Sequence, residues 1–404
     1  MVITDTVSAV GDRSFMKSIL VVAMDFPYPP GHGSAVDMWA RVLVLKEMGY
    51  HVDLLATVNE LPGEELIQFV RSQVGNLWIL PRRRGLQSAL SLLPFQVRSR
   101  IDLQTIPLNQ HYDAVLLESE YVAAILKNPA AQKAKRILRV HNEQVSYFRE
   151  FAEGTTNWLK KMYYYSESLK FRRYSARVMQ ACDLLWFISD NERQAYAQKS
   201  PHNGSKSFFV PTHVKPTDLR AYAAGSRTAL FIGTLTISHN ADAVSWFIDK
   251  VHPLLSDLEG YAFQVAGRTA GQPIPALKQL IEQHANAFLE VDPVVLDGLY
   301  ERAAVFVNPV ICGAGVKVKV IQALQAGMPI VSTSMGVEGT GFKDSEHLLI
   351  ADTPEEFAAC VRRLILEPGL AESLVRNAQK FLAEKYDMKV CMGGVLSEVL
   401  AGRD

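Results

Sequence analysis

Short apolar runs alternate with amphipathic segments along almost the whole chain. A first series of such runs covers residues 18–24, 51–58, 77–80, 112–118, 136–140, 183–188 and 207–210. Apolar runs of this kind are typical of strands buried on both faces of a parallel sheet. After a polar stretch, a second series covers residues 228–233, 262–266, 288–291, 305–310, 330–333 and 348–351. We therefore predict an α/β protein with two doubly wound sheets.

The polar stretch and the chain ends set the expected domain boundaries. Residues 211–227 are the expected linker between a first domain at 18–210 and a second at 228–386. Residues 1–17 are polar and lack an apolar core, which predicts a flexible N-terminus rather than a signal peptide. A helical pattern predicts a last helix within residues 387–404.

The composition of the chain argues against several classes of protein. The 404 residues include 42 basic and 42 acidic ones, so we expect no nucleic-acid partner. No apolar run approaches the ~18 residues of a membrane span. A reducing cytoplasm fits best, because four cysteines are far apart and lack disulfide or zinc spacing: Cys182, Cys312, Cys360 and Cys391.

Residues 307–339 carry the clearest functional pattern. They read VNPVICGAGVKVKVIQALQAGMPIVSTSMGVEG and predict a strand, a glycine loop, a helix with Lys317 and Lys319 in its first turn, and a second strand. Glycines let backbone N–H groups approach a ligand, and a helix N-terminus adds positive potential. Since the two lysines add full charges, the segment predicts a phosphate-binding anion site.

This segment resembles the donor-binding segment of the family 4 glycosyltransferases. Its pattern is similar to the G-x-G-x-K-x-K-x-x-E-A-x-x-x-G-x-P of bacterial sugar transferases of polysaccharide assembly, except that Ala314 and Gln322 replace a usual pair of glutamates. The resemblance implies a GT-B type fold, with two facing Rossmann-like domains, a deep interdomain cleft and a last helix that crosses back to the first domain. It also implies retaining transfer of a hexose from a nucleotide diphosphate sugar, expected to be UDP-linked as is common in that subgroup.

The resemblance places the donor diphosphate at the glycine loop. Lys317 and Lys319 would stabilise the leaving diphosphate, whose charge grows as the glycosidic bond breaks. Gln322 would hydrogen-bond the ribose, and Glu338 would compensate for Ala314. The donor-binding residues expected from these motifs and from two further glycine loops are Gly31, Gly33, Gly233, Thr234, Gly313, Ala314, Gly315, Val316, Gln322 and Glu338.

Candidates for the sugar and the acceptor follow predicted strands of the first domain. His141 ends such a strand, and the resemblance puts it beside the donor sugar, where it can donate or accept a hydrogen bond. We therefore expect it to be catalytic together with Lys317 and Lys319. Asp25 begins the loop that contains Gly31 and Gly33 and is expected to contact the acceptor; the alternative for this loop is a tight turn that needs glycine for steric reasons.

Glu118 and Glu120 sit two residues apart at the end of another predicted strand. If the strand continues, both side chains point the same way, as an acid and base pair or as acceptor contacts. The alternative is that one is a helix N-terminal residue and the other is solvated. We expect both to contact the acceptor.

A metal site is not expected, because the chain has no Asp-x-Asp motif to bind a divalent ion. The positive charges of the two lysines can take the place of that ion. The partners are then a nucleotide sugar donor and a saccharide or lipid-linked acceptor, with no cofactor. Residues 82–100 are basic and rich in leucine, so a helix there is expected either to contact anionic lipid at the inner face of the membrane or to pack on its own sheet. The aromatic run at 158–165 recurs at helical spacing with Leu169 and Tyr174, which predicts core packing.

Two alternatives remain open at this point. A nucleotide-sugar epimerase of the same fold would need an acid and base pair drawn from Glu118, Glu120 and His141. A catalytically silent nucleotide-sugar-binding subunit is suggested by Ala314 and Gln322.

Overall fold

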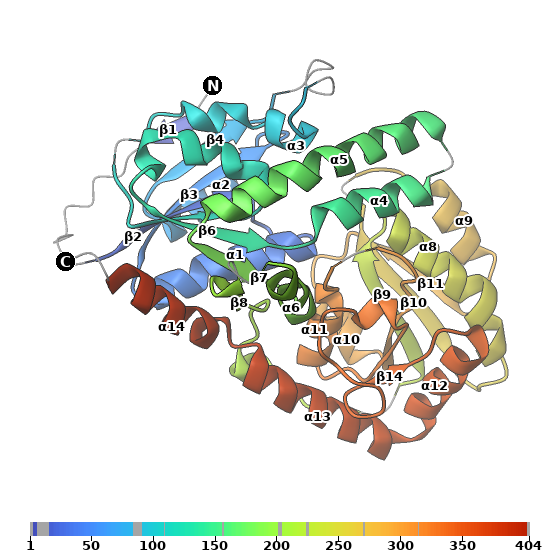
Figure 1. Ribbon diagram of the computed structural model, residues 1–404. Coiled ribbons are helices and arrows are strands. Elements are labelled where there is room, and N and C mark those ends of the chain that lie inside the picture. Colours follow the sequence, from blue (N-terminus) through green and yellow to red (C-terminus); the bar gives the residue numbers. More distant parts are fainter. Residues whose placement is uncertain are drawn as a thin grey trace. The chain divides into compact units, whose positions relative to one another are not determined.

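The computed structural model describes residues 3–5, 16–83, 91–108, 110–155, 157–200, 204–223, 226–269, 271–313 and 315–401. The chain forms two compact units. Unit 1 contains Met1–Pro30, Ser34–His213 and Met388–Asp404, and unit 2 contains Gly31–Gly33 and Val214–Asp387. Each unit is an α/β domain with its own sheet (Figure 1).

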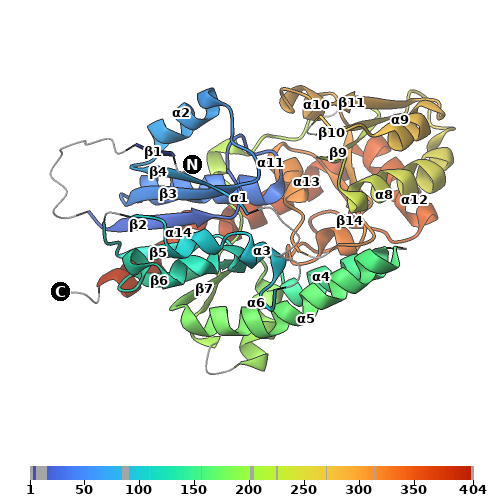
Figure 2. The same ribbon diagram turned by 90° about the horizontal axis from the view of Figure 1, so that it is seen from above.

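Unit 1 is built on an eight-stranded sheet in the order β1-β4-β3-β2-β5-β6-β7-β8, most of which is visible in Figure 2. Neighbouring strands are parallel, except that β1 pairs antiparallel with β4. From β2 the chain winds outward in both directions, as in doubly wound folds. The strands are β1 (Ile3–Asp5), β2 (Ser18–Ala23), β3 (His51–Val58), β4 (Leu77–Pro81), β5 (Ala114–Leu117), β6 (Lys135–Val140), β7 (Leu184–Phe187) and β8 (Ser207–Phe209).

Helices cover both faces of this sheet. Alternate residues of β2 face opposite ways, so Ile19 and Val21 lie in one core and Leu20 and Val22 in the other. The last helix, α14, packs in the first of these cores together with α1. The helices are α1 (Gly33–Glu47), α2 (Glu64–Gln73), α3 (Phe95–Arg98), η2 (Ile101–Gln104), η3 (Glu120–Lys127), η4 (Pro129–Ala131), α4 (Gln144–Gly154), α5 (Trp158–Ala181), α6 (Asp190–Lys199) and α14 (Met388–Ala401).

Unit 2 is built on a six-stranded sheet in the order β11-β10-β9-β12-β13-β14, and all its strand pairs are parallel. The chain again winds outward in both directions, here from β9. The strands are β9 (Thr228–Thr234), β10 (Ala262–Arg268), β11 (Ala287–Val291), β12 (Val305–Asn308), β13 (Ile330–Ser332) and β14 (Leu349–Ile350).

The two faces of the second sheet are also buried under helices. One core contains residues of α8, η6 and α12, and the other contains residues of α10, α11 and α13. The helices are η5 (Pro216–Asp218), α8 (Ser238–Trp246), η6 (Phe247–Val251), η7 (His252–Leu255), α9 (Pro275–Glu282), α10 (Asp297–Glu301), α11 (Val318–Gln325), η8 (Met335–Val337), α12 (Pro354–Leu366) and α13 (Pro368–Lys385).

The predicted α/β fold with two doubly wound sheets is confirmed. Each strand expected from the apolar runs is present, within two residues at either end. The sequence did not predict β1, which lies in the segment expected to be flexible. None of the described helices combines the length and apolar character needed to cross a membrane.

The expected amphipathic helix at 82–100 is wrong for the part of this segment that the structure describes, where the only α-helix is α3 at Phe95–Arg98. Residues 84–90 lie outside the described residues. The physical reason is that the basic side chains bond to the protein itself. Arg82 and Arg100 both donate to the carbonyl of Met24, and Arg100 is buried. These two cations therefore do not face a lipid surface.

Candidate functional site

Each sheet reverses its winding direction at one place, between β2 and β5 in unit 1 and between β9 and β12 in unit 2. Doubly wound folds bind ligands at the carboxyl ends of the strands at such a place. Polar side chains gather there in both units.

In unit 2, the glycine loop lies between the end of β12 at Asn308 and the start of α11 at Val318. Gly313 and Gly315 have φ angles of 105° and 86°, in the left-handed region that favours glycine. A Cβ atom at Gly313 would lie 3.5 Å from the ring of His239, so the loop passes close to the start of α8. Ala314 lies outside the described residues.

Both predicted lysines lie at this loop, but in different roles. Lys317 is at the N-cap of α11, and its ammonium group donates to the carbonyls of Gly313 at 2.6 Å and Gly315 at 2.7 Å. Lys319 donates to Asn240 Oδ1 at 2.8 Å, and its Nζ lies 4.3 Å from the centroid of the Phe231 ring. Lys317 therefore braces the loop, and Lys319 points across it to β9 and α8.

The electrostatic character of this cluster is cationic. Burial and the neighbouring Lys317 lower the pKa of Lys319 to about 7. Burial, Lys319 and Lys317 lower the pKa of His239 to about 4. Among the described residues, no carboxylate forms an ion pair with Lys319. An incoming anion would supply the counter-charge that this lysine lacks.

The end of β9 completes the cluster. Asn240 donates from Nδ2 to the carbonyl of Thr234 at 2.9 Å and accepts from Lys319, so one side chain links the strand end to the lysine. A Cβ atom at Gly267 would lie 1.8 Å from the carbonyl oxygen of Gly233, so only glycine fits there. The structure thus brings Gly233 and Thr234 to the same strand end as the lysine cluster.

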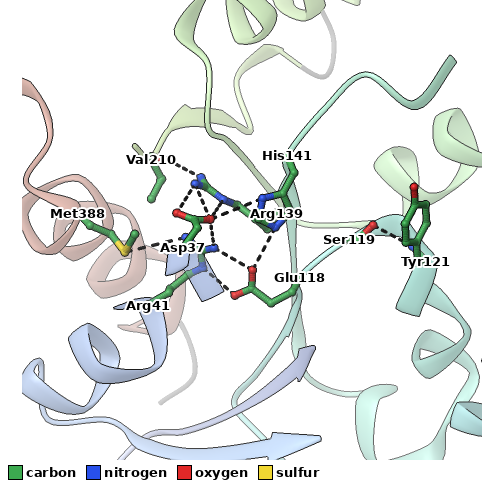
Figure 3. Close-up of polar contacts among 9 residues, drawn as sticks. All are labelled: Asp37, Arg41, Glu118, Ser119, Tyr121, Arg139, His141, Val210 and Met388. Atoms are coloured by element: carbon green, nitrogen blue, oxygen red, sulfur yellow. Dashed lines mark hydrogen bonds and ion pairs between the residues drawn. The ribbon is translucent and has the colours of Figure 1, made fainter. Parts of the chain in front are cut away.

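In unit 1, a buried network of charged side chains lies at the corresponding strand ends (Figure 3). Arg41 of α1 donates to both carboxylate oxygens of Glu118, at 2.7 and 2.8 Å, and also to Asp37. Arg139 of β6 donates to both oxygens of Asp37, each at 2.9 Å, and to the carbonyl of Val210. These four charged side chains are fully buried.

The charges in this network balance. Burial would raise the pKa of Glu118, but Arg41 lowers it to about 2. Burial would likewise raise the pKa of Asp37, but Arg139 and Arg41 hold this pKa well below the usual range. Burial lowers the pKa of Arg139 to about 10, which leaves it charged at neutral pH. Bidentate arginine pairs of this kind fix the geometry of the groups around them.

His141 follows β6 directly and lies at the edge of this network (Figure 3). Its Nε2 is 3.5 Å from Glu118 Oε2, and its Nδ1 is 3.7 Å from Asp37 Oδ2. Asp37, Glu118 and His141 each place one possible ligand atom within 4.8 Å of the other two, close enough to surround a metal ion. Both carboxylates are already neutralised by arginines, however, so this donor set does not call for a cation.

The acceptor roles expected for Glu118 and Glu120 are corrected by the structure. Glu118 is buried, and both its oxygens are held by Arg41. The strand ends at Leu117, and Ser119 caps η3 by accepting from the N–H of Tyr121 (Figure 3), so the chain turns before Glu120. Glu120 is instead the first residue of η3 and is buried, which fits the alternative that one of the two glutamates begins a helix.

The other predicted residues are scattered between strand ends and loops. Asp25 follows β2, is partly exposed and forms an ion pair with Arg82 at 3.4 Å. The remaining donor candidates are placed as follows: Gly33 begins α1, Gly31 precedes it in the loop after β2, Val316 is half-buried before α11, Gln322 is half-buried in α11, and Glu338 is exposed after η8.

Sequence reasoning missed Asp37, Arg41 and Arg139. A signal for them was present. Arg139 lies inside an apolar run expected to be buried on both faces, and a buried arginine requires a carboxylate. Asp37 and Arg41 are four residues apart, a spacing that places two residues on one face of a helix such as α1.

Comparisons with known proteins identify the family. A model of the glycosyl transferases group 1 matches residues 226–367, which include the lysine cluster. A protein of Klebsiella pneumoniae described as an uncharacterized 44.6 kDa protein in cps region is 32% identical over 395 residues, covering 95% of this chain and all of the relative. The chain belongs to the group 1 glycosyl transferases.

Solved structures show that this group 1 glycosyl transferase has the GT-B fold. Sucrose-phosphate synthase from Thermosynechococcus elongatus matches 95% of this chain and 99% of its own with a TM-score of 0.69 at 12% identity. A mutant of S. aureus TarM, in complex with fondaparinux, alpha-GlcNAc-glycerol and UDP, matches 95% and 100% with a TM-score of 0.66 at 10% identity. Anabaena HepE, in complex with UDP and glucose, matches 95% and 99% with a TM-score of 0.64 at 11% identity.

Proposed function

We propose that this glycosyl transferase moves a hexose from a UDP-linked donor to a saccharide or lipid-linked saccharide, with retention of configuration, in polysaccharide assembly. The observation that carries the proposal is the environment of Lys319. A half-buried lysine beside a second lysine and a glycine loop, without a carboxylate partner among the described residues, fits a diphosphate.

The proposed step breaks the bond between the anomeric carbon of the donor and a diphosphate oxygen. Negative charge grows on the diphosphate as this bond breaks, and Lys317 and Lys319 stabilise it. An acceptor hydroxyl forms the new bond to the anomeric carbon, and its proton passes to the diphosphate oxygen that leaves. Because the positive charges of Lys317 and Lys319 both lie at the glycine loop, we propose that the step needs no metal ion.

We propose that His141 contacts the donor sugar, with the arginine and carboxylate network holding its ring in place. Support comes from its position directly after β6 and from the two carboxylates within 3.7 Å of its ring nitrogens. A UDP-linked donor is supported by the UDP complexes of TarM and HepE, and polysaccharide assembly by the relative in the cps region.

The test is to incubate the protein with a panel of UDP-hexoses, with water or with short saccharide acceptors, and to measure free UDP and the anomeric configuration of the product. Lys319→Met should lower UDP release about 10-fold to 150-fold, as expected for the loss of a charged hydrogen bond. Lys250→Met, which removes an exposed lysine of the same unit, should have no effect. Donor turnover that is equal in the two variants would refute the assignment.

A second candidate, a silent nucleotide-sugar-binding subunit, is favoured by Gln322, which is neutral where the family usually has a glutamate. Loss of a charged acceptor there weakens a ribose contact by about 1 kcal/mol, or roughly fivefold in donor affinity. UDP-sugar binding without turnover by any acceptor would favour this candidate. The epimerase alternative is not proposed, because Arg41 holds both oxygens of Glu118 and Glu120 is buried, so neither glutamate is available as the acid or base beside His141.

A further inference from the structure

Helix α5 (Trp158–Ala181) has its apolar and polar faces reversed relative to an ordinary surface helix. Its inward face includes three polar residues, Glu167, Ser168 and Ser175, beside the apolar Phe171 and Val178. Its outward face is apolar over the first three turns, with exposed fractions of 67% for Trp158, 61% for Leu159, 63% for Met162, 39% for Tyr165 and 67% for Leu169. The core packing predicted for this aromatic run is therefore wrong for these five side chains.

The exposed apolar residues form one stripe. Trp158, Met162, Tyr165 and Leu169 are separated by four, three and four positions, which places them on one face of an α-helix. The stripe runs for about 16 Å along the helix axis at 1.5 Å per residue. Large contiguous apolar surfaces of this kind mark interaction sites.

The exposed charged side chains of α5 are all basic. Five basic side chains of α5 are exposed, and none forms an ion pair with another described residue: Lys160, Lys161, Arg172, Arg173 and Arg177. The one acid of the helix, Glu167, is buried, where it accepts from the N–H of Phe95 and from Lys170. The acids of the neighbouring α4 are Glu150 and the exposed Glu153. The exposed charge of α5 is thus entirely positive in a chain whose net charge is zero.

The helix is held rigidly in this orientation. It packs along α4 (Figure 1), with the rings of Phe148 and Phe171 stacked at 5.2 Å and the hydroxyl of Ser168 donating to the carbonyl of Val145 at 2.8 Å. Asn157 caps its first turn by accepting from two backbone N–H groups. The stripe is therefore formed before any partner binds, and binding would not have to order it.

We propose that α5 docks unit 1 on an anionic lipid bilayer. Tryptophan and tyrosine prefer the boundary between headgroups and acyl chains, leucine and methionine insert beside them, and flanking lysines and arginines attract anionic headgroups. A protein partner would require a complementary acidic groove, whereas a bilayer matches an apolar stripe on a basic helix directly. The proposal does not depend on the sugar transferred or on catalysis.

The test uses the full chain in co-sedimentation with vesicles of phosphatidylcholine alone and of phosphatidylcholine mixed with phosphatidylglycerol. The unmodified protein should bind the anionic vesicles, bind neutral ones much more weakly, and dissociate at high salt. Arg172→Gln combined with Arg173→Gln should weaken binding about 25-fold, at about fivefold for each cation removed. A triple change, Trp158→Ser, Met162→Ser and Leu169→Ser, should weaken it at least about tenfold.

Two matched controls separate this stripe from general surface effects. Lys127→Gln combined with Lys250→Gln removes two exposed cations elsewhere, and Phe288→Ser combined with Val294→Ser removes two exposed apolar side chains of unit 2. Both controls should bind as the unmodified protein does, and all variants should keep its melting temperature. Equal binding to neutral and anionic vesicles, or equal losses in variants and controls, would overturn the proposal. So would a dimer in solution that the α5 changes convert to monomers without any vesicle binding by the unmodified protein.

Discussion

Replacing Lys319 by methionine should stabilise the free protein and weaken its binding of UDP. Methionine keeps the length of the side chain and removes the charge. In the free protein, burial and Lys317 lower the pKa of Lys319 to about 7, so the surroundings oppose its ammonium form. A bound diphosphate reverses that preference, because it supplies the missing counter-charge.

The sign and size of the stability effect follow from this pKa. The ordinary lysine pKa is 10.5, so between pH 7 and 10.5 the unfolded chain binds more protons than the folded one, and stability rises with pH. Below pH 7 both states are protonated, and the full cost of the buried charge is present. The difference between 10.5 and about 7 corresponds to a cost on the order of 5 kcal/mol. Lys319→Met should therefore raise the free energy of unfolding most at pH 6 and little near pH 10.

Calorimetry of UDP binding provides the second measurement. At pH 8 the free protein should hold Lys319 mostly neutral, so binding should take up close to one proton, visible as a difference between buffers of unlike ionisation enthalpy. In Lys319→Met this proton uptake should disappear, and affinity should fall about 10-fold to 150-fold. Lys250→Met should change neither quantity. Proton uptake that persists in Lys319→Met, or a variant less stable than the parent at pH 6, would refute the reasoning.

Three further predictions concern the metal and the buried charges. A strong chelator should leave transferase activity unchanged; activity lost on chelation and restored by magnesium or manganese would contradict the role of the lysines. Burial raises the pKa of Glu120 to about 7 from 4.5, so stability should fall as pH rises through this window, and Glu120→Gln should raise the free energy of unfolding by up to about 3 kcal/mol at pH 8 but not at pH 4. Arg41→Met leaves Asp37 and Glu118 short of a counter-ion and should destabilise the protein by about 3–5 kcal/mol, most of it recovered by adding Glu118→Met, as denaturant unfolding would measure.

The fold was largely predictable because its signal is local. A strand buried on both faces is an apolar run, and the order of such runs predicts doubly wound sheets. The exception is β1, which has three residues and pairs at the edge of its sheet, where no period can be read. This strand forms because it pairs with β4, and three residues alone do not reveal such a pairing.

The proximity of candidate site residues was predictable where these residues are close in sequence. It was not predictable where they come from distant parts of the chain. The glycine loop and its two lysines lie within seven residues, so the motif brings them together. The fate of Glu118 depends on Arg41, which is 77 residues away, and no spacing rule connects them. For α5 the helical spacing predicted core packing, which holds for Tyr164 and Tyr174 but not for the exposed stripe, because spacing alone does not say whether a side chain meets the core or the exterior.

The two clusters differ in one property that separates a framework from a binding site. In unit 1, Arg41 and Arg139 face Asp37 and Glu118, so two positive charges meet two negative ones and the hydrogen bonds close on themselves. A ligand would add little stability to such a network, because its charges are already paired. The role of the network is to hold His141 in a fixed position at its edge. In unit 2, the partners of Lys319 among the described residues are the neutral oxygen of Asn240 and the face of Phe231, with another cation nearby. A buried charge without its opposite is costly to the folded chain, and the ligand that supplies the opposite charge gains that energy on binding. The excess charge, more than any single contact, is therefore the reason to look for the substrate's phosphates in unit 2.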